Sequence, residues 1–179
     1  MSSLPKLQKE IIKNLAMSGP STINGISKAL SKDYKAVHTA WSSLQKKELL
    51  RVSGEKWYRQ RKFKEYWLTE KGVLEAIRMG VPIKLLITEW NEIYPNNQKE
   101  EMNLLNDLVD ELGEAKVRLI ASLFLEEKDP LNIKFNKYFD EQDFKHFLYV
   151  AYKYPTYRRL VKKARKAFNE FFDELEKSL

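Results

Sequence analysis

The segment DYKAVHTAWSSLQKKELLRV, residues 33–52, decides how the N-terminal half of this chain folds. Its apolar side chains recur at i, i+3, i+4 and i+7, which is the spacing of one helix face. These residues are Val37, Ala40, Trp41 and Leu44. The helical spacing ends at Lys47, and the stretch from Leu49 to Ser53 is typical of a strand. The segment therefore predicts a helix over about 33–47 that leads directly into a strand.

Two shorter helices are expected before this segment. The first covers about Pro5 to Met17, and Gly19-Pro20 ends it. The second follows Ser21 or Thr22 as its cap and carries Ile23, Ile26 and Leu30 on one face. Residues 31–33 then form a tight turn into the segment above.

A second strand is expected over residues 63–69, after the basic stretch SGEKWYRQRK at 53–62. Ser53-Gly54 is the candidate turn in that stretch. Thr69-Glu70-Lys71-Gly72 opens a further helix that ends near Gly80, and residues 80–82 are the expected domain boundary. The first domain is thus expected over residues 1–80.

The second domain, residues 81–179, is expected to be all-helical and to serve as a dimerisation or accessory domain. Helical apolar stripes begin at Ile83, Leu105, Val117 and Phe144, and Pro155-Thr156 opens a long last helix. The predicted fold class is mainly α: three helices and a β-hairpin form the first domain, and helices alone form the second.

The N-terminal half resembles the winged helix-turn-helix proteins of the MarR-like and PadR-like regulators. The segment 33–52 is similar to their recognition helix and first wing strand. KEYWLTEKG at 64–72 is similar to their second wing strand and following helix. The resemblance covers about residues 5–80. Glu48 departs from it where the turn often has Gly, and Trp41 replaces the usual aliphatic residue. The resemblance implies a winged helix domain that binds double-stranded DNA and regulates transcription.

The charge distribution favours the same function. Residues 1–80 hold 16 Lys/Arg and 7 Asp/Glu, or +9, and residues 81–179 hold 16 and 18, or −2. A basic domain is the electrostatic footprint of a polyanion partner. With the apolar face of 33–47 turned inward, the other face offers cations and small polar groups to DNA. These candidate DNA contacts are Lys35, His38, Thr39, Ser42 and Lys46, with Lys32 and Thr22 from the preceding turn and helix start.

The hairpin supplies a second set of candidate DNA contacts. Five cations fall within nine residues: Lys56, Arg59, Arg61, Lys62 and Lys64. An arginine at the tip of such a wing can enter the minor groove or bind the backbone. Tyr66 and Trp67 are expected in the core, and the roles of Trp57 and Tyr58 stay open.

The last helix carries a seam for a partner helix, at alternating steps of three and four residues. The seam residues are Val161, Ala164, Phe168, Phe171 and Leu175. Its basic first half and acidic second half favour an antiparallel homodimer, and packing within its own domain is the alternative.

No motif for catalysis is found, so the chain is expected to be a non-enzyme without a cofactor. The carboxylates around Asp107 and Asp110 are expected to form a solvated helix face. The chain has no Cys and only two His, so no metal site is expected. No signal peptide or membrane span is evident, which predicts a cytoplasmic protein. A winged helix that binds other proteins, or a replication or segregation factor, remains an alternative to a regulator, and any small-molecule effector stays open.

Overall fold

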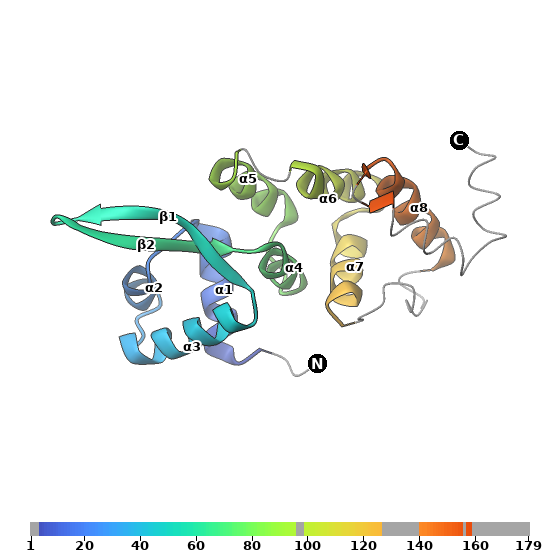
Figure 1. Ribbon diagram of the computed structural model, residues 1–179. Coiled ribbons are helices and arrows are strands. Elements are labelled where there is room, and N and C mark those ends of the chain that lie inside the picture. The colour runs from blue at the N-terminus through green and yellow to red at the C-terminus, as the bar shows by residue number, and fades with distance from the viewer. Residues whose placement is uncertain (1–3, 96–98, 127–139, 156, 159–179) are drawn as a thin grey trace. The chain divides into compact units, whose positions relative to one another are not determined.

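A computed structural model describes residues 4–95, 99–126, 140–155, 157 and 158. The chain divides into two compact units, Met1–Pro95 and Asn96–Leu179. The N-terminal unit holds helices and a two-stranded antiparallel sheet, and the described part of the C-terminal unit is helical (Figure 1). The predicted fold class, mainly α with a winged helix-turn-helix domain followed by helices, is confirmed.

The elements of the N-terminal unit follow the winged helix-turn-helix order. They are α1 (Lys6–Ser18), α2 (Ile23–Ala29), α3 (Tyr34–Lys46), β1 (Leu50–Tyr58), β2 (Arg61–Leu68), α4 (Glu70–Arg78) and α5 (Ile83–Ile93). The backbone of Ser21 adds one antiparallel bridge to Tyr66, through hydrogen bonds of 3.1 and 3.0 Å. This bridge fixes the start of α2 against the base of the hairpin.

The core of this unit is built around three tryptophans. Trp41 of α3, Trp67 of β2 and Trp90 of α5 are all fully buried. Trp67 donates a hydrogen bond of 2.8 Å to the carbonyl oxygen of Leu15 at the end of α1. Its ring lies 5.8 Å from that of Trp90, so one side chain connects the first helix, the hairpin and the last helix of the unit.

Helix α3 follows its predicted pattern closely. The side chain of Asp33 caps its start by accepting a hydrogen bond of 3.1 Å from the Ala36 amide. All four predicted inward residues of α3 are buried. The helix ends at Lys46, and Glu48 then adopts a φ of 58°, the left-handed conformation that a Gly would take most easily.

The start of α4 is locked onto this turn. Thr69 caps α4 by accepting from the Gly72 amide, and its hydroxyl donates to the carbonyl oxygen of Glu48 at 2.6 Å. A Cβ on Gly72 would lie 2.2 Å from the carbonyl oxygen of Leu49. Only Gly fits at this close approach.

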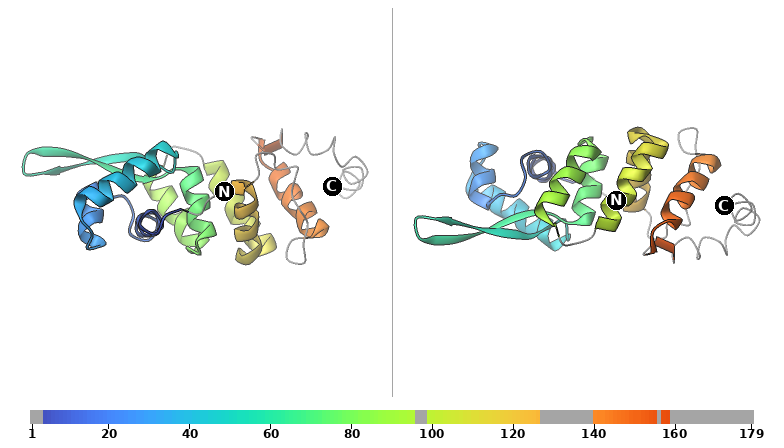
Figure 2. Two further views of the ribbon diagram at one scale, coloured as in Figure 1. Left: turned by 90° about the horizontal axis from the view of Figure 1, so that it is seen from below. Right: turned by 90° about the horizontal axis from the view of Figure 1, so that it is seen from above.

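The hairpin differs from the sequence expectation in its length and its turn. The turn lies at Arg59-Gln60, where φ is 45° and 62°, and not at Ser53-Gly54. Two left-handed residues give the twist that a two-residue hairpin loop needs. The pairing shifts between Val52 and Gly54, so Ser53 is the extra residue of a bulge within β1. Both strands are therefore longer than predicted, and the wing projects beyond α2 and α3 (Figures 1 and 2).

The N-terminal unit extends beyond the boundary expected at residue 80. Helix α5 packs against α1, and its residues Ile83, Leu86 and Trp90 are fully buried. The rings of Trp90 and Tyr94 lie 4.9 Å apart, and both lie near Trp67. The compact unit accordingly runs to Pro95.

The described elements of the C-terminal unit are α6 (Lys99–Leu112), α7 (Glu114–Glu126) and α8 (Glu141–Tyr152). Helix α6 contacts both α7 and α8. Asp140 and Asp143 form a capping box at the start of α8, and Asp143 also binds Lys116 of α7. Tyr154 donates a hydrogen bond of 2.8 Å to Asp107 of α6. Polar contacts thus join α8 to α7, and the segment after α8 to α6.

Candidate nucleic-acid interface

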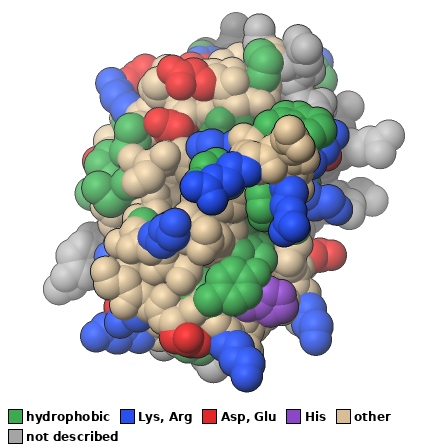
Figure 3. All heavy atoms as spheres, turned by 90° about the vertical axis from the view of Figure 1, so that its left-hand side faces the viewer, with side chains coloured by type: hydrophobic (Ala, Val, Ile, Leu, Met, Phe, Trp, Pro, Cys, Tyr) green, Lys and Arg blue, Asp and Glu red, His purple; other side chains and the backbone are tan. Residues whose placement is uncertain are grey.

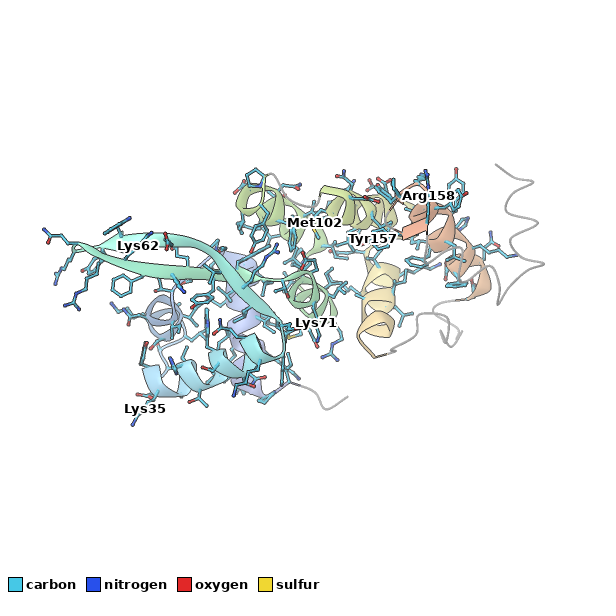
Figure 4. The ribbon with its side chains drawn as sticks, viewed as in Figure 1. Lys35, Lys62, Lys71, Met102, Tyr157 and Arg158 are labelled. Atoms are coloured by element: carbon cyan, nitrogen blue, oxygen red, sulfur yellow. The ribbon has the colours of Figure 1, made fainter. Side chains whose placement is uncertain are left out.

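The outward face of α3 offers hydrogen-bonding groups without negative charge. Lys35, His38, Thr39 and Lys46 are exposed, and Ser42 is half-buried. Figure 4 shows Lys35 pointing away from the helix. No acidic residue occurs between Tyr34 and Lys46. The five residues predicted on this helix therefore do share its solvent-facing side.

The hydroxyl groups on this face already donate within the helix. Thr39 donates to the carbonyl oxygen of Lys35 at 3.0 Å, and Ser42 donates to that of His38 at 2.9 Å. Each hydroxyl oxygen keeps lone pairs toward solvent, so in this arrangement both groups act as acceptors. Amino groups of adenine and cytosine are the matching donors in the major groove.

Tyr34 lies on the same face of α3, although it was not among the contacts predicted from the sequence. Its side chain is 50% exposed, and its ring lies 6.0 Å from that of His38. The signal was present, because Tyr34 and His38 are spaced i, i+4 on the helix. Together they give the N-terminal half of α3 an exposed pair of rings.

The turn before α3 positions the two remaining candidates differently. The Thr22 side chain is half-buried and accepts from the Gly25 amide at 3.0 Å, so it serves as the cap of α2. Lys32 is exposed, and its carbonyl oxygen accepts from the Ser27 hydroxyl at 2.7 Å. The structure thus gives Thr22 a local role and leaves the Lys32 ammonium group in solvent.

The strand register distributes the wing side chains over two faces. Lys56 pairs with Phe63 and Tyr58 pairs with Arg61, so these four side chains share one face. Glu55 pairs with Lys64 and Trp57 pairs with Lys62, and these share the other. Each face of the wing therefore carries both aromatic rings and cations.

Two of the five predicted wing cations are neutralised locally. Lys62 forms an ion pair with Glu55, and Lys56 lies 4.0 Å from Glu65. Arg61 and Lys64 have no ion-pair partner among the described residues, and Arg59 lies over the Tyr58 ring at 5.3 Å. Arg59, Arg61 and Lys64 are thus the wing cations available to an anion.

Arg51 is a sixth cation of the hairpin, but it faces the core. Its guanidinium group lies 3.9 Å from the Tyr94 ring centroid and 3.6 Å from the Glu70 carboxylate. Burial raises the pKa of the Tyr94 hydroxyl. Arg51 therefore connects the base of the wing to α5 and contributes to stability.

The aromatic residues of the hairpin divide as expected. Trp67 is fully buried, and Tyr66 is half-buried with its ring 5.3 Å from that of Trp41 in an edge-on contact. Trp57 and Tyr58, whose roles the sequence left open, are 67% and 59% exposed. Figure 3 shows the side of the molecule that the wing tip faces, where basic and apolar side chains are interspersed near the centre and acidic ones lie mainly toward the upper and lower parts.

The C-terminal unit adds no chemical centre within its described part. Asp107, Asp110 and Glu114 have side-chain partners in Tyr154, Asn106 and Arg118. No three His, Asp or Glu side chains among the described residues are grouped to hold a metal ion. None of the described helices has the length and apolarity that crossing a membrane requires.

The predicted dimer seam lies outside the described residues. It comprises Val161, Ala164, Phe168, Phe171 and Leu175.

Comparisons with known proteins return similarity to solved structures only. No protein-family model matches the chain, and no curated protein matches it. A cysteine-to-serine mutant of ZitR from Lactococcus lactis is 23% identical with a TM-score of 0.39, over 64% of this chain and 76% of that one. A mutant of ZitR with a cysteine and a histidine replaced by alanine is 24% identical with a TM-score of 0.38, over 63% of this chain and 75% of that one.

Proposed function

We propose that the N-terminal unit binds double-stranded DNA, with α3 in the major groove and the wing along the neighbouring backbone. The observation that carries this proposal is the outward face of α3. It presents Lys35, His38 and Thr39 to solvent, and the helix contains no acidic residue. An α-helix fits the major groove, and the N-terminal residues of a recognition helix are those that reach base edges.

The wing supports the proposal through its free cations. Arg59, Arg61 and Lys64 project from a hairpin that extends past the helices, where a DNA backbone beside α3 would run (Figure 2). Contacts of this kind to phosphate set position and affinity, whereas contacts from α3 to base edges set sequence preference. The two surfaces therefore have separable effects.

A salt titration tests DNA binding directly. Affinity for a labelled duplex, measured by fluorescence anisotropy, is expected to fall with a log–log slope of about −0.9 per phosphate neutralised. Arg59→Ala with Arg61→Ala should lower the affinity for every duplex and reduce the slope. Lys13→Ala with Lys71→Ala removes the same charge from exposed positions on α1 and α4, and should leave the affinity nearly unchanged.

Sequence preference is tested on α3. Lys35→Ala or His38→Ala should change the ranking of duplexes, by about 1–3 kcal/mol for a lost base contact. If these variants and the wing variants weaken all duplexes equally, α3 is not the recognition helix. If the wild-type protein binds no duplex at low salt, the domain is a protein-interaction module.

We further propose that the protein regulates transcription as a homodimer, in the manner of the MarR-like or PadR-like regulators that its N-terminal sequence resembles. The support is the apolar seam of the C-terminal sequence and its opposed charge halves. Phe168→Glu with Phe171→Glu should give a folded monomer in sedimentation, with weaker DNA binding. A wild-type monomer at micromolar concentration would contradict the dimer, and recovered genomic DNA without promoters would favour a replication or segregation factor.

A further inference from the structure

The exposed aromatic side chains of the described chain are concentrated on the wing. Trp57, Tyr58 and Phe63 are 67%, 59% and 42% exposed, and Val52 on the same hairpin is 46% exposed. Large rings left in water are unfavourable, and a cluster of them marks a surface that meets a partner. The core does not require them there, because every residue of the wing from Glu55 to Lys64 is exposed.

Cations accompany the rings closely. The Lys62 ammonium lies 5.9 Å from the Trp57 ring centroid, and the Arg59 guanidinium lies 5.3 Å from that of Tyr58. On the Trp57 face Lys62 is paired with Glu55, and Lys64 is the cation that remains available to a phosphate. An exposed ring with an available cation on the same face is the combination that holds a nucleotide: the base stacks on the ring and the cation neutralises the backbone. The partner that this arrangement fits is therefore nucleic acid.

A lipid surface would also attract rings and cations, but the hairpin is unsuited to it. The wing is a two-stranded sheet, so both of its outer edges carry backbone groups that lack a strand partner. Hydrocarbon offers these groups no hydrogen bonds, whereas the wet groove of DNA does. Glu55 and Glu65 on the wing are a further obstacle to an anionic membrane.

We propose that Trp57 stacks on a base that is unpaired or unstacked, so that the protein prefers a distorted duplex to a regular one. This inference rests on the proposed DNA binding. In a regular duplex both faces of each base are covered by its neighbours, so a ring gains a stacking partner only by opening a step. Opening costs least at a mismatched base. Trp57 has the larger ring and the greater exposure, and Tyr58 and Phe63 lie on the opposite face of the wing.

Paired duplexes test the preference. One duplex is fully complementary, and its counterpart carries a single mismatch or bulged base at each of several positions. We expect the wild-type protein to bind the best mismatched duplex about tenfold more tightly than the complementary one. Trp57→Ala should abolish this ratio, and Trp57→Phe should keep most of it. Tyr152→Ala removes another exposed ring, from the C-terminal unit, and should leave the ratio unchanged.

Tryptophan fluorescence gives an independent readout, because the four tryptophans differ sharply in their exposure to solvent. Trp41, Trp67 and Trp90 are fully buried, so iodide should quench Trp57 alone in the free protein. On the mismatched duplex this quenchable fraction should disappear, and Trp57→Phe should lack it from the start. The Phe variant also verifies that the signal comes from the wing.

The outcomes separate this inference from the proposed function. Salt-dependent binding of both duplexes with equal affinity, or iodide quenching that persists in the complex, overturns the stacking role and leaves DNA binding intact. No binding to either duplex overturns both proposals. Binding to phosphatidylserine vesicles with a blue-shifted Trp57 signal, and no preference among duplexes, would assign the wing to a membrane and also overturn the inference.

Discussion

Glu48 and Gly72 show how single residues set the junction between α3, β1 and α4. Glu48 has a φ of 58° in the turn after α3, and its carbonyl oxygen accepts from the Thr69 hydroxyl. Gly72 lies against the carbonyl oxygen of Leu49 in the same junction. One position therefore tolerates a residue that strains the backbone, and the other tolerates no side chain at all.

Glu48→Gly is expected to stabilise the protein. The left-handed conformation costs a residue with a Cβ about 1–2 kcal/mol, and part of this gain is lost to the greater freedom of Gly in the unfolded chain. The net expectation is about 1 kcal/mol in urea unfolding. Gln45→Gly, in the last turn of α3, should instead destabilise by a similar amount. If both variants lose the same free energy of unfolding, the backbone at Glu48 is not strained.

Gly72→Ala is expected to destabilise the protein by about 2–3 kcal/mol, because the new Cβ collides with backbone that cannot move without breaking the Thr69 contacts. Thermal unfolding measures the loss. Gly54→Ala is the matched control, since a Cβ there meets only the Glu65 carboxylate at 3.9 Å. A tolerated Ala at position 72 would mean that α4 can shift away from Leu49.

At the scale of elements, the helices and strands of each unit are held together by a few specific polar contacts as well as by the apolar core. Trp67 ties β2 to α1, and Tyr154 ties the segment after α8 to α6. Burial, and then the hydrogen bond to the Asp107 carboxylate, raise the pKa of Tyr154 to about 12. The phenol must stay protonated to donate this bond.

This contact predicts a pH dependence for the C-terminal unit. The pKa of Tyr154 is raised above its unfolded value of 10.0, so its contribution is complete below pH 10 and is lost as the pH rises toward 12. Tyr154→Phe should lower stability at pH 8 by about 1 kcal/mol and have a smaller effect near pH 11. Urea unfolding followed by circular dichroism at both values measures the difference. A constant difference would show that the bond to Asp107 contributes nothing.

At the scale of the whole molecule, the chain consists of two compact units, and α5 belongs to the first. Its residue Trp90 is fully buried and lies near Trp67. Removing α5 would take Trp90 away and expose the Trp67 ring and the face of α1 that α5 covers.

Two fragments test this division. Residues 1–95 should fold cooperatively and bind duplex DNA with the intrinsic affinity of the N-terminal unit. Residues 1–80 should be strongly destabilised, because burying a Trp-sized side chain contributes about 3–5 kcal/mol that is lost when its partners are removed. Circular dichroism and thermal unfolding compare them. A stable 1–80 fragment would place α5 outside the folding unit.

The sequence by itself determined the order of elements and the orientation of α3. Val37, Ala40, Trp41 and Leu44 follow a helical period, and a helix turns all residues of that period to one side whatever its partner is. The outward position of Lys35, His38 and Thr39 then follows from local geometry alone. Tyr66 and Trp67 were likewise recognisable as core residues near the base of the wing.

Only the tertiary structure decided where the wing turns, how far the first unit extends and which of the wing cations are paired with glutamates. The turn at Arg59-Gln60 depends on which residues of β1 and β2 pair, and the bulge after Val52 shifts that pairing. The place of α5 depends on Trp90 lying near Trp67, 23 positions earlier in the chain. Lys56 and Lys62 are neutralised because the register sets glutamates beside them. In each case the deciding contact joins residues that local periodicity does not connect, so its free energy is realised only in the folded chain.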